Sequence, residues 1–315
     1  MSTSQAQAEL KALYANLAAV ILGKQESLFV VLVALLARGH VLLEDVPGTG
    51  KTMLAKALAR SLTGTFRRLQ CTPDLMPSDV TGLSIYRSDR HEFQFMPGPV
   101  FTDILLADEI NRATPRAQSC LLECMEERQV SVDGESRGLS PGFFVIATQN
   151  PMGFHGTYPL PEAQLDRFLV RIRLGYPSLE SEMTMMSDRM QQQPIESLQP
   201  VMDVESLVRL QTLATRVVVK PDVLKYIAEI ARATRSDEAV LLGVSPRGSL
   251  ALMRASQCAA LLSGKTFVTP DHVKRIAVPV LAHRLTLKNA SDSVAAEALI
   301  ARILEKTVAP VAAAA

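Results

Sequence analysis

The segment from His40 to Thr52, HVLLEDVPGTGKT, constrains the fold of this chain more than any other stretch. An apolar run ends in a glycine-rich turn, and an apolar pattern with helical spacing follows over about residues 52–62. Gly48 and Gly50 allow the backbone to curl so that several N–H groups point toward one anion. A strand, a glycine-rich turn and a helix in this order predict a phosphate-binding loop.

The polar residues of this loop have predictable roles. Lys51 can reach the β- and γ-phosphates of a nucleotide, and the Thr52 hydroxyl can ligate Mg²⁺. The helix that follows directs the positive end of its dipole at the same phosphates. Asp45 departs from the general pattern G-x-x-x-x-G-K-[ST], which begins with glycine. Because this first position ends the strand, the departure weakens the pattern but leaves the phosphate cradle in place.

Short apolar runs alternate with amphipathic stretches from His40 to about Tyr176. The expected strands are residues 41–44, 66–71, 103–107, 143–148 and 168–174. Strands that alternate with helices predict an α/β fold, in which a parallel sheet is sandwiched by helices and binds ligands at the carboxyl ends of its strands. Two hairpins are expected to interrupt this alternation, one within residues 83–95 and one within residues 129–144.

The pattern beyond Pro177 is helical throughout and predicts a small all-α lid domain. We expect residues 1–190 to form the nucleotide-binding core with its N-terminal helices and both hairpins. Residues 191–203 are expected to form a linker. Residues 204–315 are expected to form the lid, with a frayed tail at its end.

Composition and charge disfavour several classes of protein. Lys and Arg number 33 against 32 for Asp and Glu, and this formal charge of +1 gives nucleic-acid binding no electrostatic support. The longest apolar run, residues 28–37, is too short to span a bilayer, and the N-terminus lacks the pattern of a signal peptide. Four cysteines without C-x-x-C spacing favour reduced thiols and a cytoplasmic location.

Two further expected strands end in polar side chains suited to phosphate chemistry. The apolar run ILLA is followed by Asp108 and Glu109, which is a Walker B arrangement. Asp108 would hold Mg²⁺ through water, and Glu109 would polarise the attacking water. The run FVIATQ ends at Asn150, whose amide can bond both that water and the γ-phosphate. An asparagine before proline is also an ordinary turn residue, so Asn150 alone is a weak indication.

Two arginines complete the candidate set. Arg167 stands just before the last expected core strand, and Arg247 lies in the first turn of an expected lid helix. The helix dipole disfavours a cation at a helix N-terminus, so Arg247 indicates an anionic partner. A surface ion pair is the alternative for each arginine taken alone.

The motifs DVPGTGKT, ILLADEINRA, VIATQNP, GTYPLPEAQLDRF and GVSPRG occur in this order. Together they resemble the MoxR family of AAA+ ATPases over roughly residues 21–285. The resemblance implies a Mg²⁺-dependent ATPase that assembles into a ring, expected to be a hexamer. It implies a chaperone-like motor that matures or activates protein complexes, often with a separate von Willebrand factor A-domain protein. Neither nucleic acid nor a membrane is an expected partner.

The resemblance also implies roles for particular residues. The first hairpin would be the helix-2 insert and the second the pre-sensor-1 hairpin, both facing the pore. Asn150 would be sensor 1, Arg247 sensor 2, and Arg167 the arginine finger that reaches a neighbour's ATP. Arg112 is an alternative finger, and Arg247 acts on the nucleotide of its own subunit or of the adjacent one.

These inferences give three expected sets of residues. The expected catalytic residues are Lys51, Glu109, Asn150, Arg167 and Arg247. The residues expected to bind ATP are Gly23, Val46, Pro47, Gly48, Thr49, Gly50, Lys51, Thr52, Met53, Asp108 and Arg247. The expected Mg²⁺ ligands are Thr52 and Asp108.

Three other functions remain open at this point. A P-loop kinase of a small metabolite would need a lid shaped for that substrate. A DNA-handling AAA+ motor would need basic contacts that the net charge does not indicate. A nucleotide-gated scaffold with negligible turnover is disfavoured because every hydrolytic element is present.

Overall fold

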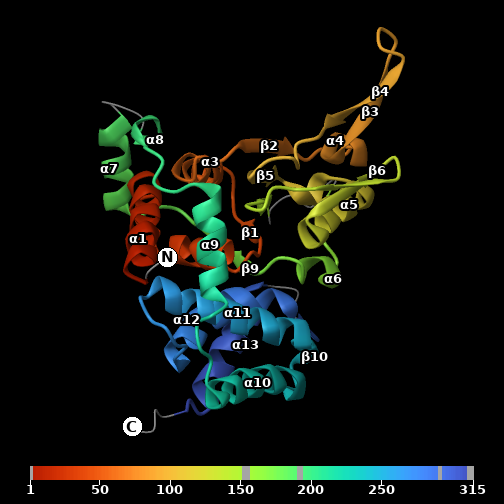
Figure 1. Ribbon diagram of the computed structural model, residues 1–315. Helices are drawn as coiled ribbons and strands as arrows, with labels where there is room; N and C mark the ends of the chain where they lie inside the picture. The colour runs from red at the N-terminus through yellow and green to blue at the C-terminus, as the bar shows by residue number, and fades with distance from the viewer. Residues whose placement is uncertain (1–2, 151–156, 190–193, 290–292, 311–315) are drawn as a thin grey trace.

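A computed structural model describes residues 3–150, 157–189, 194–289 and 293–310. Its centre is a five-stranded sheet in the order β2-β5-β8-β1-β9, in which every neighbouring pair is parallel (Figure 1). The strands are β1 (Val41–Glu44), β2 (Phe66–Gln70), β5 (Ile104–Asp108), β8 (Phe144–Gln149) and β9 (Val170–Ile172). The predicted α/β class and parallel sheet are confirmed.

Helices cover both faces of this sheet, and the strands divide their side chains between two cores. Leu43, Leu106 and Ile146 pack in the first core with α1 (Thr3–Val20), α2 (Gln25–Leu36) and α3 (Lys51–Ser61). Their chain neighbours Leu42, Leu105 and Val145 pack in the second core with α5 (Pro115–Glu127). Because successive side chains of a strand point to opposite faces, a strand that is covered on both sides is apolar at every position.

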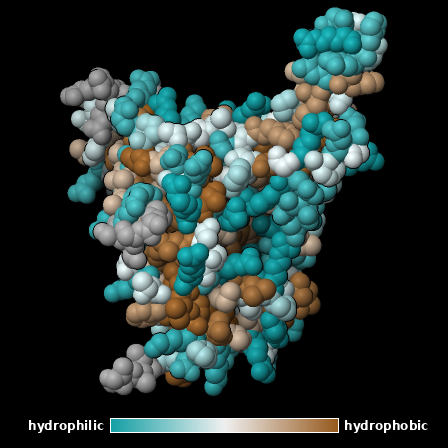
Figure 2. All heavy atoms as spheres, viewed as in Figure 1, coloured by the Kyte–Doolittle hydropathy of each residue, from teal (hydrophilic) through white to brown (hydrophobic). Residues whose placement is uncertain are grey.

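Two hairpins leave this core. The first pairs β3 (Gly82–Arg87) with β4 (Glu92–Pro97), follows α4 (Pro77–Thr81), and projects far from the body of the molecule (Figure 1). Its tip is mostly hydrophilic (Figure 2). The second pairs β6 (Gln129–Val132) with β7 (Glu135–Gly138). Its turn, Asp133-Gly134, has positive φ angles of 55° and 79°, as a tight hairpin turn requires.

The C-terminal region is helical, as predicted. It contains α9 (Val204–Ala214), α10 (Pro221–Ser236), α11 (Pro246–Leu262), α12 (Pro270–Leu281) and α13 (Ser293–Lys306). A short antiparallel pair, β10 (Val240–Leu242) with β11 (Thr286–Leu287), adds strands that the helical periodicity does not reveal. None of the helices within the described ranges combines the length and apolar character that crossing a bilayer requires.

The domain boundaries stay predictions. Between core and lid the chain forms α7 (Leu179–Arg189) and the single-turn α8 (Pro194–Ser197), which falls inside the expected linker. The predicted boundary at residues 190–191 and the last five residues of the expected tail lie outside the described residues.

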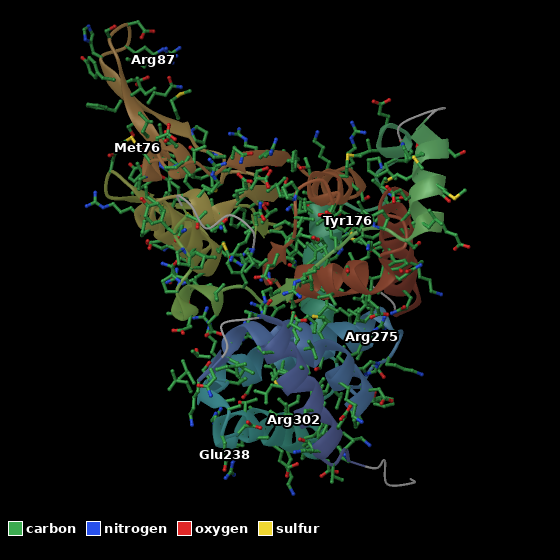
Figure 3. All side chains as sticks on the ribbon, turned by 180° about the vertical axis from the view of Figure 1, so that it is seen from behind. Met76, Arg87, Tyr176, Glu238, Arg275 and Arg302 are labelled. Carbon is green, nitrogen blue, oxygen red and sulfur yellow. The ribbon has the colours of Figure 1, made fainter. Side chains whose placement is uncertain are left out.

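The lid is fastened to the core by charged contacts. Arg284 follows α12, and only 4% of its side chain is exposed. Its Nε donates to Asp166 Oδ1 at 2.6 Å and its Nη2 to the carbonyl of Phe168 at 2.8 Å. Elsewhere between lid and core, the guanidinium of Arg275 lies 3.5 Å from the ring centroid of Phe29, and Figure 3 shows Arg275 where the two regions meet.

Replacing Asp166 by Asn is expected to lower the free energy of unfolding by about 3 kcal/mol, because the buried charge of Arg284 then has no counter-ion. Urea unfolding measures the change. A matched control is Asp237→Asn, which neutralises the partner of Arg302 on the lid surface (Figure 3). Because Arg302 is half exposed, this change is expected to cost less than about 1 kcal/mol. Equal effects of the two substitutions would contradict the fastening role of Asp166.

A buried histidine lies at the start of β1. His40 Nδ1 accepts from the backbone N–H of Val145 at 2.9 Å, so Nε2 carries the proton and donates to the carbonyl of Met125 at 3.1 Å. Burial lowers the pKa of His40 from its usual 6.5 to about 3, with a further lowering from Arg128 and an opposing effect of the Met125 carbonyl. The neutral imidazole therefore joins the sheet to the end of α5.

The stability of the protein is expected to fall as the pH drops below about 6.5. The unfolded chain protonates His40 near pH 6.5, whereas the folded chain resists protonation down to about pH 3. The loss should approach about 1.4 kcal/mol per pH unit for each such histidine. His40→Gln keeps a hydrogen-bond donor and an acceptor but does not titrate. In urea titrations between pH 6 and pH 4, the slope of the unfolding free energy against pH should therefore fall by the equivalent of about one bound proton. An unchanged slope in the variant would be the contrary result.

Candidate active site

The carboxyl ends of three strands meet at one pocket. Because β8 lies between β5 and β1 in the sheet, the residues that follow these strands are brought together. The pocket has a volume of about 450 Å³ and is lined by Pro47, Gly48, Gly50, Lys51, Thr52, Met53, Arg68, Gln70, Asp108, Glu109 and Asn150. Nine of the expected site residues therefore share this pocket.

The glycine-rich turn is shaped as an open cradle. Gly48 and Gly50 have φ angles of 87° and 93°, which L side chains rarely adopt. A Cβ on Gly48 would meet no atom within 4 Å, so its backbone faces open space. A Cβ on Gly50 would lie 3.7 Å from Cδ1 of Ile21, in the segment that follows α1. Gly23, with a φ of 71°, belongs to the same segment but is not among the pocket-lining residues.

Asp45 has a structural role that explains its departure from the general loop pattern. Its side chain is 6% exposed. Oδ2 accepts from the backbone N–H groups of Leu174 and Gly175, each at 2.8 Å, and Oδ1 accepts from that of Val46 at 3.0 Å. The carboxylate thus ties the start of the loop to the chain that leaves β9.

Backbone carbonyls of the loop hold the Lys51 side chain in place. Its Nζ donates to the carbonyls of Asp45 at 2.9 Å and Val46 at 3.1 Å. Partial burial lowers the pKa of Lys51, while the carboxylates of Asp45, Asp108 and Glu109 oppose that shift. The two backbone carbonyls that Lys51 contacts are weak, neutral acceptors, so a phosphate can displace them from the ammonium group.

Thr148, in the neighbouring strand β8, positions the carboxylate of Asp108 and the backbone of Glu109. Its hydroxyl donates to Asp108 Oδ1 at 2.6 Å and accepts from the backbone N–H of Glu109 at 2.8 Å. Glu109 has a positive φ of 59°, a strained conformation that tends to persist at functional sites. This turn directs Glu109 away from the strand and into the pocket.

Three basic or amide side chains contact these carboxylates. Arg68 Nη2 donates to Asp108 Oδ2 at 2.6 Å. Gln70 Nε2 and Arg112 Nη1 donate to Glu109 Oε2 at 3.3 Å and 3.0 Å. Arg112, the alternative finger, is therefore engaged within its own subunit.

Sequence reasoning missed Thr148, Arg68 and Gln70. Thr148 could have been noticed as a lone hydroxyl after the apolar run of β8. Arg68 and Gln70 could have been noticed by their i, i+2 spacing, which places both on one face of the edge strand β2. Asn150 does line the pocket, and its carbonyl accepts from Asn111 Nδ2 at 3.5 Å.

The chemistry of the pocket fits Mg²⁺ and a nucleotide. The Thr52 hydroxyl and the Asp108 carboxylate are oxygen ligands of the kind that Mg²⁺ prefers. Thr52 directly follows Lys51 in the chain. The open cradle, the N-terminus of α3 and Lys51 together supply donors for phosphate oxygens. Val46 and Thr49 are engaged within the loop, where the Thr49 hydroxyl donates to the Val46 carbonyl at 3.3 Å.

Arg167 and Arg247 do not line this pocket. They line a second cleft of about 470 Å³ between the core and the lid. Arg167 Nε lies 3.2 Å from Glu126 Oε2, and Arg247 Nη1 lies 3.1 Å from Glu126 Oε1. Arg247 Nε also lies 3.7 Å from Asp166 Oδ2. The structure thus divides the expected catalytic residues between two places on one subunit.

Asp45→Ala is expected to lower the free energy of unfolding by about 2 kcal/mol, because the N–H groups of Leu174 and Gly175 lose their acceptor. Asp45→Asn should have a smaller effect, since its amide keeps one acceptor oxygen. Urea unfolding of both variants tests the role of this contact. Asp45→Ala with wild-type stability would contradict it.

Two family models and a solved structure match this chain. Residues 40–170 match the family described as "ATPase family associated with various cellular activities (AAA)", and residues 232–303 match the AAA lid domain. A crystal structure of a proposed ATPase from Cytophaga hutchinsonii is 33% identical, with a TM-score of 0.90 over 98% of this chain and 97% of that one.

Three curated proteins are similar over nearly the whole chain. "Uncharacterized protein YeaC" of Bacillus subtilis is 49% identical over 93% of this chain and 92% of its own length. "Chaperone MoxR1" of Mycobacterium tuberculosis is 42% identical over 92% of this chain and 80% of its own length. "Protein MoxR" of Paracoccus denitrificans is 31% identical over 94% of each chain.

Proposed function

The chain belongs to the MoxR family of AAA+ ATPases, and we propose that it hydrolyses ATP at sites shared between the subunits of a ring. The division of the candidate residues supports this proposal most directly. Lys51, Glu109 and Asn150 line one pocket, whereas Arg167 and Arg247 line another cleft. In this proposal each subunit contributes residues to two sites, one half to the site for its own nucleotide and the other half to the site of its neighbour.

The first half-site binds the nucleotide and prepares the water. The loop and the N-terminus of α3 cradle the phosphates, and Lys51 supplies a positive charge. Thr52 and Asp108 would hold Mg²⁺, which neutralises charge on the phosphates when bound. Glu109 accepts a hydrogen bond from the attacking water, while the amide of Asn150 orients that water against the γ-phosphate. Thr148 holds the Asp108 carboxylate and the backbone N–H of Glu109 in place.

The second half-site stabilises the transition state on the neighbour. Arg167 and Arg247 are assigned to the nucleotide of the adjoining subunit, where guanidinium groups match phosphate oxygens in geometry and charge. Arginines supplied in trans are worth about 10³–10⁵ in rate in related phosphoryl transfers. An isolated subunit should therefore turn over slowly, and its specific activity should rise with protein concentration.

The biological role that we propose is chaperone-like remodelling or activation of protein complexes by a ring, expected to be a hexamer. The name of the Mycobacterium tuberculosis relative supports this role. We assign β3–β4 as the helix-2 insert and β6–β7 as the pre-sensor-1 hairpin, both directed to the pore. A separate von Willebrand factor A-domain protein is the proposed partner.

Mixing two inactive variants tests the shared site. Glu109→Gln removes the group that polarises water, and Arg167→Gln removes the arginine for the neighbour. Each variant alone should lose nearly all turnover, and Glu109→Gln should still bind ATP. Mixed rings contain some sites with both functional halves, so phosphate release should recover to a substantial fraction of wild type.

The controls separate the remaining alternatives. A mixture that stays as inactive as its components would place both residues in one subunit's site and contradict the shared-site proposal. A phosphorylated acceptor in place of free phosphate would identify a kinase. Stimulation of hydrolysis by DNA would favour a DNA-handling motor.

A further inference from the structure

Glu126, at the end of α5, joins the two arginines assigned to the neighbouring subunit. Each of its carboxylate oxygens faces one guanidinium, with Oε2 3.2 Å from Arg167 and Oε1 3.1 Å from Arg247. The three residues come from α5, from the segment before β9 and from the lid helix α11. A phosphate group held by two arginines would present its oxygens in the same way.

The surroundings of this bridge are strongly cationic. The cleft is lined by five arginines, and Glu126 is the one acidic residue among the residues that line it. Arg254 makes no ion pair within the described residues. Burial and the nearby Arg128 lower the pKa of His40 to about 3, so this histidine stays neutral and adds no charge. Outside the lining residues, Asp166 lies 3.7 Å from Arg247 but also pairs with Arg284. These two carboxylates therefore balance only part of the positive charge of the five arginines.

We propose that Glu126 is an internal competitor for phosphate, whose carboxylate occupies the place between Arg167 and Arg247 that a phosphate of the neighbour's nucleotide takes in the ring. This inference rests on the shared site proposed above and adds its regulation. Glu126 acts through the two arginines and is a positioning residue.

The exchange of carboxylate for phosphate is favourable for electrostatic reasons. A polyphosphate carries several negative charges, while Glu126 carries one, and the surplus arginines of the cleft favour the more highly charged anion. Glu126 is 36% exposed, so the displaced carboxylate can turn to water at little desolvation cost.

Glu126 also has a role in the free subunit, where it holds Arg167 and Arg247 in position. Two guanidinium groups this close repel each other, and Glu126 holds them together before any phosphate arrives. The same contact makes the arginines unavailable to weak or monovalent anions. Assembly would then depend on a neighbour that carries nucleoside triphosphate, because only that ligand outcompetes the carboxylate.

Phosphate binding to the isolated cleft tests the competition directly. The chain is used as Lys51→Ala, which weakens the nucleotide pocket, at a protein concentration where it is monomeric. Inorganic tripolyphosphate is the probe, and affinity is measured by calorimetry. Glu126→Gln should bind the probe roughly fivefold more tightly, as expected on loss of one exposed ionic competitor. Arg167→Gln combined with Arg247→Gln should abolish this binding.

Two matched variants complete the test. Glu127→Gln removes one negative charge from the same helix outside the cleft and should leave the affinity unchanged, and Glu126→Asp keeps the charge and should resemble the parent chain. Unchanged or weaker binding by Glu126→Gln would overturn the proposal, because a carboxylate that only braces the arginines would weaken binding when removed.

A separate measurement distinguishes this inference from the proposed function. Sedimentation of the otherwise wild-type chain with a non-hydrolysable ATP analogue reports nucleotide-driven assembly. Failure to assemble would contradict the shared site, while the tripolyphosphate affinities still decide the role of Glu126. If rings form, Glu126→Gln should assemble at a lower protein concentration than wild type, and an equal or higher midpoint would count against the competition.

Discussion

Parallel pairing of β8 with both β1 and β5 is the constraint on which the site depends. This order places the glycine-rich loop, the pair Asp108 and Glu109, and Asn150 at one edge, although they are far apart in the chain. Parallel strands require covered faces, so the same pairing demands helices on both sides and apolar side chains along most of the central strands β1, β5 and β8. Two local contacts then order this edge of the sheet. Asp45 ties the loop to the end of β9, and Thr148 binds both the Asp108 carboxylate and the backbone N–H of Glu109.

The second half of the machinery depends on charge rather than on the sheet. Asp166 pairs with the buried Arg284 and approaches Arg247, and Glu126 bridges Arg247 and Arg167. The lid and the two arginines that we propose to act on the neighbouring subunit therefore share one network of ion pairs. Because Asp166 contacts both Arg247 and Arg284, a change in the charge near Arg247 also changes the electrostatic environment of the contact between lid and core.

Strands, helices and the residues at strand ends were largely predictable because each is governed by local spacing. Gly48 and Gly50 marked the loop, and the apolar runs marked the strands of the central sheet. Contacts between distant segments were not predictable. Arg68 meets Asp108 only because β2 pairs with β5 in register, and Glu126 meets Arg247 only because the lid docks beside α5. From the sequence, Asp45 was only a departure from the general loop pattern, whereas in the structure its carboxylate accepts three backbone N–H hydrogen bonds.

The sequence by itself determined the fold class, the family resemblance and the identity of the chemical groups, because periodicity and short motifs are properties of neighbouring residues. Tertiary structure alone decided which groups face one another. It placed Lys51, Asp108 and Glu109 in one pocket, and it placed Arg167 and Arg247 around Glu126 in another. The reason is that ion pairs and strand register act across space, at separations along the chain that no local pattern records.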